Sequence, residues 1–403
     1  MKKIFKKLIL LTSEFPYGKV EPFLESEFPM LIEGFEEILI FTESIKGESR
    51  IEYSCAEIHL IDSICWKSRI SSLLNKEFYS ELNYLRQKEK FKLSTFRAAW
   101  YSLTKAISIF RQLESLEDKA SFVFYSYWFD EKALALALLK KKYPDLKVVS
   151  RAHGWDIYEE RHPDIYLPYR NLLAKKLNTV YSISDNGRFY LVNKYSNFKE
   201  KIQVIRLGTM PLVSIPKKSN LGIFQILSIS SMISLKRVDK ILEVVSSIQT
   251  IKIKWTHIGT GPEFERIKKL AKLKRQENPN FSFEILGHVP NSELRELLSN
   301  QYFDLFINLS ETEGIPVSIM EAQSAGLPVL ATNVGGSAEI VSSENGFLVD
   351  KNFNTQDVVS IIQKFFSENK IVQKRKRNAS FKSWENNYSY KNYRRFTESL
   401  QKS

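Results

Sequence analysis

Two glutamates eight positions apart, Glu313 and Glu321, are the residues whose types and spacing most clearly suit chemistry. An apolar run over 303–309 predicts a buried strand just before them, and Pro316 is typical of the first turn of a helix. Glu313 would therefore stand just ahead of the helix and Glu321 inside it. Carboxylates placed in this way can accept hydrogen bonds from two different sets of hydroxyls on one ligand. The alternative is that Glu313 caps the helix and Glu321 is a surface charge.

The backbone at the start of the same helix is suited to an anion. The first amides of a helix have no partner within it, and they lie at the positive end of its dipole. A diphosphate would fit here, with one carboxylate on nearby sugar hydroxyls and the other on the vicinal hydroxyls of a ribose. The residues of this turn are Gly314, Ile315, Pro316, Val317 and Ser318.

A second glycine-bearing turn begins at Gly259 and resembles a dinucleotide-binding fingerprint. The position of the third glycine in that fingerprint holds Phe264 instead. We therefore interpret Gly259 and Gly261 as part of a nucleotide-side loop, with His288 and Val289 as a wall for the base.

The elements that must position these residues alternate between strands and helices. Such alternation, with largely apolar strands, is typical of parallel sheets covered by helices on both faces. The predicted strands are 7–12, 37–41, 121–126, 146–152, 178–183, 202–206, 223–229, 251–258, 281–286, 303–308 and 328–332. The clearest predicted helices are 131–142, 237–249, 262–275, 291–299 and 316–325.

A segment from 206 to 220 contains glycine and proline residues that interrupt both periodicities. We predict two α/β domains, over 1–205 and 206–380. Open α/β sheets bind ligands at the carboxyl ends of their strands, so a cleft between the two domains is the expected site. Residues 66–117 form a helical insertion rich in Lys, Phe, Tyr and Leu. We favour amphipathic helices that cover the first sheet, and contact with a membrane or a lipid acceptor is the alternative.

The composition limits the class of protein. The chain has 403 residues, 43% of them apolar, which excludes a mostly disordered chain. Its net charge of +13 suits anionic lipid or phosphorylated substrates, but no zinc-finger spacing or RNA-binding aromatic signature occurs, so no nucleic-acid partner is expected. Cys55 and Cys65 are too few for a disulfide framework and are typical of buried or half-buried thiols in a reducing compartment. No stretch approaches the about 18 consecutive apolar residues of a membrane span.

The segment 311–336 closely resembles the Glu-x7-Glu motif of the retaining family 4 (group 1) glycosyltransferases, which have the GT-B fold. The resemblance covers nearly the whole chain. It includes Ser13-Glu-Phe-Pro-Tyr-Gly, Ser150-Arg-Ala-His-Gly-Trp-Asp, Ile205-Arg-Leu-Gly, Leu235-Lys-Arg-Val-Asp, Ile258-Gly-Thr-Gly-Pro-Glu, Leu286-Gly-His-Val and a closing aromatic helix near Trp384. It implies two Rossmann-like domains facing each other across a cleft, with a helix over 381–403 that packs back on the first domain.

The resemblance also implies roles for single residues. Glu321 would hold the ribose of the nucleotide, and Glu313 with the turn at 314–318 would hold the donor sugar and diphosphate. Lys236 matches the diphosphate-binding lysine of the family. His153 matches the histidine that contacts the transferred sugar, although a lone histidine after a predicted strand is by itself more often structural.

Two positions depart from the family pattern. An arginine commonly stands five residues before the lysine, but Ser231 stands here. Either Arg237 or another cation compensates, or the diphosphate is held more weakly. The loop after the first strand normally carries adjacent glycines that let phosphate and acceptor approach, whereas this chain has only Gly18.

The implied activity is transfer of a sugar from a nucleotide diphosphate sugar to a hydroxyl of a saccharide acceptor, with retention of anomeric configuration. The implied acceptor is linked to polyprenyl diphosphate, in the assembly of a bacterial capsule, exopolysaccharide or lipopolysaccharide. The sequence has no Asp-x-Asp motif, so we expect no metal and no cofactor beyond the sugar nucleotide as co-substrate. The expected location is the cytoplasm, with peripheral binding to the anionic inner face of the cytoplasmic membrane as an extension.

Two other functions remain open from the sequence. A sugar-nucleotide epimerase of the GT-B fold would bind the same donor and need no acceptor. A non-catalytic glycosyltransferase-like partner protein would need neither glutamate, so the intact pair argues against it.

Overall fold

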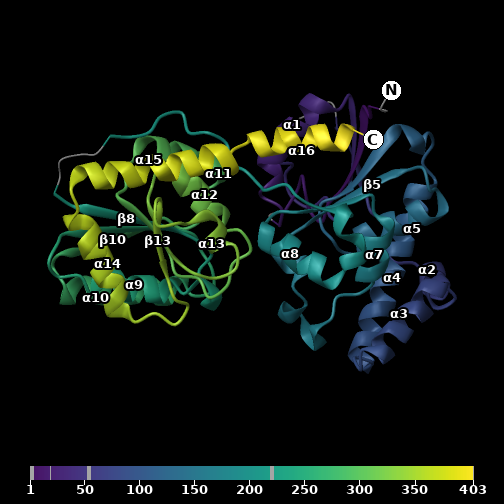
Figure 1. Ribbon diagram of the computed structural model, residues 1–403, viewed down its shortest axis with the longest axis horizontal. Coiled ribbons are helices and arrows are strands. Elements are labelled where there is room, and N and C mark those ends of the chain that lie inside the picture. The colour runs from purple at the N-terminus through teal and green to yellow at the C-terminus, as the bar shows by residue number, and fades with distance from the viewer. Residues whose placement is uncertain (1–3, 19, 52–55, 218–221, 403) are drawn as a thin grey trace. The chain divides into compact units, whose positions relative to one another are not determined.

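The computed structural model describes residues 4–18, 20–51, 56–217 and 222–402, and Cys55 lies outside these ranges. The chain forms two compact units (Figure 1). The first unit comprises residues 1–206 and 392–403, and the second comprises 207–391. The chain therefore returns to the first unit at Asn392, eleven positions after the start of the predicted C-terminal helix at 381.

The first unit is built on a seven-stranded sheet in which neighbouring strands are parallel. The strand order is β3-β2-β1-β4-β5-β6-β7. The strands are β1 (Lys7–Leu11), β2 (Glu37–Thr42), β3 (Ala56–Leu60), β4 (Phe122–Ser126), β5 (Lys147–Ala152), β6 (Thr179–Ser182) and β7 (Ile202–Val204). The helices are α1 (Leu24–Gly34), α2 (Trp66–Leu73), α3 (Lys76–Gln87), α4 (Leu93–Glu114), α5 (Glu131–Lys142), α6 (Gly154–Ile157), α7 (Arg170–Lys176), α8 (Asp185–Lys194) and α16 (Lys391–Gln401).

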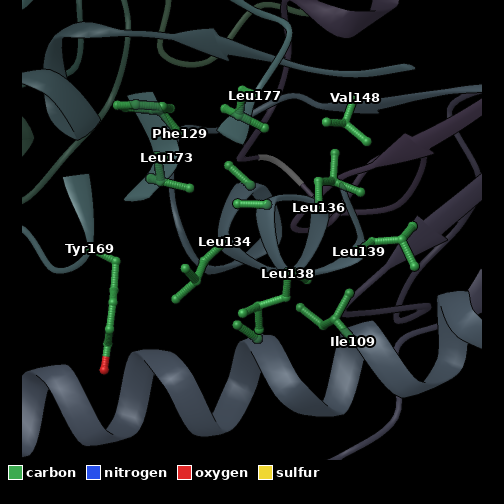
Figure 2. Packing of buried hydrophobic residues seen from close by; sticks show 14 of the residues in the cluster. Ile109, Phe129, Leu134, Leu136, Leu138, Leu139, Val148, Tyr169, Leu173 and Leu177 are labelled. Atoms are coloured by element: carbon green, nitrogen blue, oxygen red, sulfur yellow. The ribbon is translucent and has the colours of Figure 1, made fainter. Parts of the chain in front are cut away.

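Side chains alternate between the two faces of this sheet, as strand geometry requires. Leu8 and Leu10 of β1 pack with α1 and α16 on one face. Ile9 and Leu11 belong to a second core, which includes residues of α4, α5 and α7. Figure 2 shows part of this second core, where leucines of α5 lie close to residues of α4, α7 and β5.

The helical insertion lies against the second core. Helix α4 packs on α5, and both α2 and α3 pack on α4. Leu103 and Ile107 of α4 are buried in the core, as are Phe78 and Leu82 of α3. The favoured interpretation, that these amphipathic helices cover the first sheet, therefore holds for α3 and α4. Cys65, just before α2, is an exposed free thiol and not a buried one.

The second unit has a six-stranded sheet of parallel neighbours in the order β10-β9-β8-β11-β12-β13. Helices α9, α10 and α14 contribute to the core on one face, and α12 packs against α15. The strands are β8 (Phe224–Ile229), β9 (Ile253–Ile258), β10 (Phe281–Ile285), β11 (Leu305–Asn308), β12 (Val329–Thr332) and β13 (Gly346–Val349). The helices are α9 (Val238–Ser246), α10 (Phe264–Glu277), α11 (Asn291–Asn300), α12 (Val317–Ser324), α13 (Ser337–Ile340), α14 (Thr355–Ser367) and α15 (Lys370–Asn387).

The predicted α/β class with two parallel, Rossmann-like sheets is confirmed. Two strands, β3 and β13, were not predicted from the sequence. Both are edge strands: β3 mixes apolar and polar residues that are partly or fully exposed, and β13 is apolar but only four residues long, so its pattern does not distinguish a strand from another short apolar run. Within the described ranges, no helix combines the length and apolar character that crossing a bilayer requires.

Candidate functional site

The second unit changes its direction of winding between β8 and β11. The loops after these neighbouring strands diverge from the carboxyl edge of the sheet, and ligands of open α/β sheets bind at such a switch point. The two loops are joined by a hydrogen bond of 2.8 Å from the Glu311 amide to the Leu235 carbonyl. This topology brings together residues that lie 77 positions apart in the chain.

The central pair of the site is Lys236, after β8, and Glu313, after β11. The Lys236 Nζ lies 2.8 Å from both carboxylate oxygens of Glu313, and the Asn308 Nδ2 donates to Oε1 at 3.2 Å. Glu313 is buried, whereas the Lys236 side chain is 26% exposed. The pair therefore presents its cationic member to solvent. Glu313 does not cap α12, whose N-cap residue is Pro316 and has no side-chain cap.

The loop after β12 supports the turn that carries Glu313. The Gly336 amide donates to the Gly314 carbonyl at 2.7 Å. Gly335 has φ +51°, and a Cβ there would lie 1.9 Å from the Glu313 carbonyl oxygen. No other residue type fits at Gly335 without moving one of the two loops.

Glu321 lies on α12, one helical turn inside the segment that begins at Val317. It is partly buried, so it is not a freely solvated surface charge. Burial raises the pKa of its carboxyl to about 7, and the positive charge of Arg295 on α11 offsets only part of that effect. Among the described residues its carboxylate has no hydrogen-bond partner, which leaves both oxygens available to ligand hydroxyls.

Arg237 is engaged by the neighbouring loop after β13. Its Nη1 donates to the Lys351 carbonyl at 2.8 Å, and its guanidinium lies 5.0 Å from the centre of the Phe353 ring. Arg237 also has φ +50° and stands at the N-cap of α9, which begins at Val238. Arg237 is therefore directed to the loop after β13, whereas Lys236 is directed to Glu313.

The glycines after β9 allow two loops to pack closely. Gly259 and Gly261 have φ +143° and +159°, and a Cβ on either would clash with the carbonyl of Ser230 or Met232, at 1.9 and 2.5 Å. These glycines thus fix the path of the loop that leads to Lys236. His288, after β10, is exposed, and Val289 is partly buried. Their contact with a base stays a prediction.

A buried polar chain under the same loop was missed in the sequence. The Trp255 Nε1 donates to the Ser228 Oγ at 2.8 Å, and that hydroxyl lies 2.8 Å from Nδ1 of His257. The other ring nitrogen, Nε2, lies 3.2 Å from the Ser230 carbonyl. Burial lowers the pKa of His257 to about 4, so the ring is neutral at pH 7 and its Nε2–H donates to Ser230. A histidine within an apolar strand gives no sequence signal of this role.

His153 and Gly18 belong to the first unit. His153 follows β5 and is 5% exposed, between the rings of Tyr127 and Trp128 at 4.7 Å each. Neither of its ring nitrogens has a hydrogen-bond partner among the described residues. The Asp156 carboxylate lies 3.7 Å from Nδ1. This imidazole is buried and oriented, and it keeps its hydrogen-bonding capacity.

The loop after β1 is shaped by a buried carboxylate that the sequence did not reveal as important. Glu21 is fully buried and accepts hydrogen bonds of 2.7–2.9 Å from the three successive amides of 13–15. It also accepts from the Trp128 Nε1 at 2.7 Å. Gly18, with φ +55°, closes the same loop against Glu14. This chain therefore orders the loop through Glu21, where the family pattern has adjacent glycines.

A cavity of about 690 Å³ lies within the first unit, and its lining includes residues that follow β1 and β4. This is the switch point of the first sheet, where the strand order reverses between these two strands. The lining combines aromatic rings and carboxylates, a set that suits the apolar faces and the hydroxyls of sugar rings. These residues are Tyr101, Trp128, Trp155, Tyr166, Asp130, Glu131, Asp156 and Asp164. No cluster of three or more His, Cys, Asp or Glu side chains able to hold a metal ion occurs in the ranges that the structure describes.

Part of the chain matches a known protein family. Residues 215–381 match the family described as Glycosyl transferases group 1. The chain is 24% identical to the O-antigen biosynthesis glycosyltransferase WbnH of Escherichia coli, over 80% of this chain and 92% of WbnH. It is 28% identical to WcaL of Escherichia coli K12, named as a colanic acid biosynthesis glycosyltransferase. That match spans 51% of this chain and about half, 52%, of WcaL.

Solved structures share the fold over nearly the whole length. The lipopolysaccharide outer core galactosyltransferase WaaB superposes with a TM-score of 0.65 and 14% identity, over 98% of this chain and 99% of WaaB. Anabaena HepE, solved with UDP and glucose, also has a TM-score of 0.65, with 12% identity over 98% and 99% of the two chains. The chain therefore has the GT-B fold, and its residues 215–381 match the group 1 glycosyltransferases.

Proposed function

We propose that this protein transfers a sugar from a nucleotide diphosphate sugar to a hydroxyl of a saccharide acceptor, with retention of the anomeric configuration. The observation that carries the proposal is the Lys236 ammonium held by the buried Glu313 carboxylate beside the first turn of α12. A cation and a helix N-terminus are thereby placed together at the switch point of the second sheet. This combination suits the diphosphate of a donor.

The chemical barrier is cleavage of the bond between the anomeric carbon and the diphosphate oxygen. Negative charge grows on the departing diphosphate while positive charge grows on the sugar. Lys236 and the first amides of α12 would stabilise the leaving group, and Glu313 would keep the lysine in place before the donor binds. We propose that these groups act without a metal ion or another cofactor. Because Lys236 is held at Glu313, just ahead of α12, whereas the guanidinium of Arg237 contacts the loop after β13, we assign the main cationic role to Lys236.

The remaining residues fit the same assignment. The unpaired carboxylate of Glu321 would accept hydrogen bonds from the ribose hydroxyls. The cavity of the first unit, with Trp128 and Asp130 in its lining, would bind sugar rings of the acceptor. His153 keeps two free ring nitrogens and would contact the transferred sugar. The leaving phosphate would take the proton of the acceptor hydroxyl, which attacks on the same face of the sugar.

The names of the relatives suggest the biological setting. WbnH is named for O-antigen and WcaL for colanic acid biosynthesis, so we propose a role in the assembly of a bacterial surface polysaccharide. We further propose that the acceptor is linked to polyprenyl diphosphate and that the protein works at the inner face of the cytoplasmic membrane. The net charge of +13 favours an anionic membrane surface.

The test is a thermal-shift screen of nucleotide sugars, beginning with UDP-sugars, followed by transfer assays with the best donor. A donor at 100 times its Kd should stabilise the protein by about 2.7 kcal/mol. Lys236→Ala should lower the transfer rate about 100- to 1000-fold. The matched control is Lys240→Ala, because Lys240 also pairs with a glutamate, Glu243, at 2.8 Å, but on the exposed side of α9.

NMR of the products separates the outcomes. An α-linked product from an α-linked donor supports retention, and a modified sugar nucleotide released without acceptor would show an epimerase instead. Equal transfer rates for wild type and Lys236→Ala would overturn the assignment of the site.

A further inference from the structure

We propose that the outward face of α2 is a membrane-docking surface, which inserts its apolar side chains among the headgroups of an anionic bilayer. This surface would mediate the membrane association that is part of the proposed function. Vesicle binding can be measured without donor or acceptor, so its test is separate from that of the transferase activity.

Helix α2 has its polar and apolar faces reversed. A helix on a globular protein normally buries its apolar stripe and exposes polar residues. At about 100° per residue, positions 66, 70, 73 and 74 share one side of α2, and Ser68 and Ser72 lie opposite. Both serines are fully buried. The apolar residues are exposed: Trp66 (66%), Ile70 (49%), Leu73 (39%) and Leu74 (77%).

Polar contacts fix the orientation of α2 on the first unit, where it packs on α4 (Figure 1). The Ser72 Oγ lies 2.8 Å from the Thr104 Oγ1 on α4. Arg111 of α4 donates to the Ser68 Oγ at 3.4 Å and to the Ser71 Oγ at 2.6 Å. Rotating the helix to bury its apolar stripe would break these bonds and leave buried polar groups unpaired. The serine face of α2 is therefore the face that packs on the protein. The apolar stripe of α2 remains exposed and can contact an external partner.

The charges around the stripe identify that partner. Lys67 and Arg69 flank the stripe on its two sides, and residues 64–76 include three basic residues and no acidic one. An apolar stripe between basic flanks is typical of helices that lie in the plane of an anionic membrane surface. Trp66 adds an amphipathic ring of the kind enriched at that depth.

A groove beside α2 extends the basic surface. It has a volume of about 370 Å³, and Arg111, Lys141 and Lys142 line it together with Ser71 and Asn75. The two lysines are paired with glutamates, whereas the bonds of the Arg111 guanidinium go to neutral serines and the Cys65 sulfur. Arg111 therefore keeps its full charge available for a lipid phosphate next to the inserted stripe.

The experiment compares binding of the full-length protein to vesicles of phosphatidylcholine with and without phosphatidylglycerol. Wild type should co-sediment with the anionic vesicles, and less at higher salt. The double variant Trp66→Ser/Leu74→Ser should bind at least about tenfold more weakly, because two large apolar side chains no longer enter the lipid. The control Phe189→Ser/Val213→Ser removes two apolar side chains of comparable or greater exposure, 67% and 98%, from outside α2 and should bind like wild type.

Two further variants test the two parts of the surface. Lys67→Glu/Arg69→Glu should abolish the preference for phosphatidylglycerol. Trp66→Phe should still bind, but it should lose the part of the tryptophan quenching by brominated lipids that Trp66 contributes. Unchanged urea unfolding midpoints would show that each variant keeps its fold, since the serine face of α2 is untouched.

Equal vesicle binding by wild type and Trp66→Ser/Leu74→Ser would overturn the proposal, as would no binding of wild type to anionic vesicles. A change in oligomeric state of that variant, with vesicle binding unchanged, would assign the stripe to contact between copies of the chain instead. Donor stabilisation by nucleotide sugars would be unaffected in all these cases, so failure here is distinguishable from failure of the transferase assignment.

Discussion

At the candidate donor site, the two glutamates of the motif differ in how their charge is compensated. The carboxylate of Glu313 lies between Lys236 and Asn308 and is matched by a cation before any ligand binds. The carboxylate of Glu321 has only the more distant charge of Arg295. Glu321 thus carries an electrostatic cost in the free protein that hydroxyl donors of a ligand would relieve.

The electrostatic cost of the partly buried Glu321 carboxylate predicts that Glu321→Gln changes the stability of the protein in a pH-dependent way. The folded-state pKa of the carboxyl is raised from 4.5 to about 7, so folding favours the protonated form. Its contribution to stability is complete below pH 4.5 and is lost as the pH rises through 7. Glutamine resembles the protonated form at every pH. Glu321→Gln should therefore match wild type at pH 4 and exceed it by about 2 kcal/mol at pH 8, a value reduced for the partial exposure of the side chain.

Urea unfolding from pH 4 to pH 8 measures this difference. The variant should bind the nucleotide sugar more weakly at pH 8, because the amide offers one acceptor oxygen in place of two. A stability difference that stays constant across the pH range would contradict the role of burial in raising the pKa.

At the scale of elements, the donor site depends on loops that approach one another through glycines. The loop after β12 touches the turn after β11 at Gly335 and Gly336, and the loop after β9 touches the one after β8 at Gly259. The helix α12 can present its first turn only if these backbones stay in contact. The glycines therefore control the position of Glu313 and Lys236 without touching a ligand.

Gly335→Ala tests this dependence. A Cβ would lie 1.9 Å from the Glu313 carbonyl oxygen, so the turn must move and donor affinity should fall about tenfold or more. The matched control is Gly222→Ala, where φ is also positive, +64°, but no atom lies within 4 Å of the added Cβ. Both variants carry the strain of a positive φ, about 1 kcal/mol, and only Gly335→Ala should lose donor binding in calorimetric titration. Equal affinities would show that the turn adapts.

At the scale of the whole molecule, the chain completes its first unit only with its last helix. Helix α16 belongs to the first unit although it follows the entire second unit in sequence. Phe396 of α16 is fully buried, 4.0 Å from the guanidinium of Arg151. Arg151 in turn pairs with Glu27 at 3.0 Å, and both are fully buried. Phe396 thus covers the buried ion pair and contacts the face of the Arg151 guanidinium.

Phe396→Ala should destabilise the first unit by about 3–5 kcal/mol, through the cavity it leaves and the lost contact with Arg151. The control Arg394→Ala, an exposed position of the same helix, should change stability little. Urea unfolding followed by tryptophan fluorescence measures the loss of stability. Calorimetric titration with a nucleotide sugar measures whether the second unit still binds the donor. Weaker donor binding by the folded Phe396→Ala variant would contradict a purely local effect.

The amino-acid sequence was sufficient to predict the class of fold, and its motif around Glu313 and Glu321 was sufficient to propose a donor site. Because strands buried in a parallel sheet are nearly continuous apolar runs, the central strands of both sheets could be predicted from the sequence. The spacing of Glu313 and Glu321 around the start of a helix at Pro316 is also a local pattern, so it could be recognised in the sequence. The edge strand β3 lacks that signal because its residues are partly or fully exposed, and the apolar run of β13 is only four residues long.

Which residues contact one another followed from the three-dimensional arrangement of the strands and helices. The pairing of Lys236 with Glu313 depends on β8 and β11 being neighbours in the sheet, which no local pattern encodes. The roles of Glu21 and His257 likewise follow from the groups that burial places around them. A helical pattern shows which residues of α2 share a face, but it does not show which face packs on the protein. The structure shows that the serine face is buried, because α4 provides polar partners for the serines.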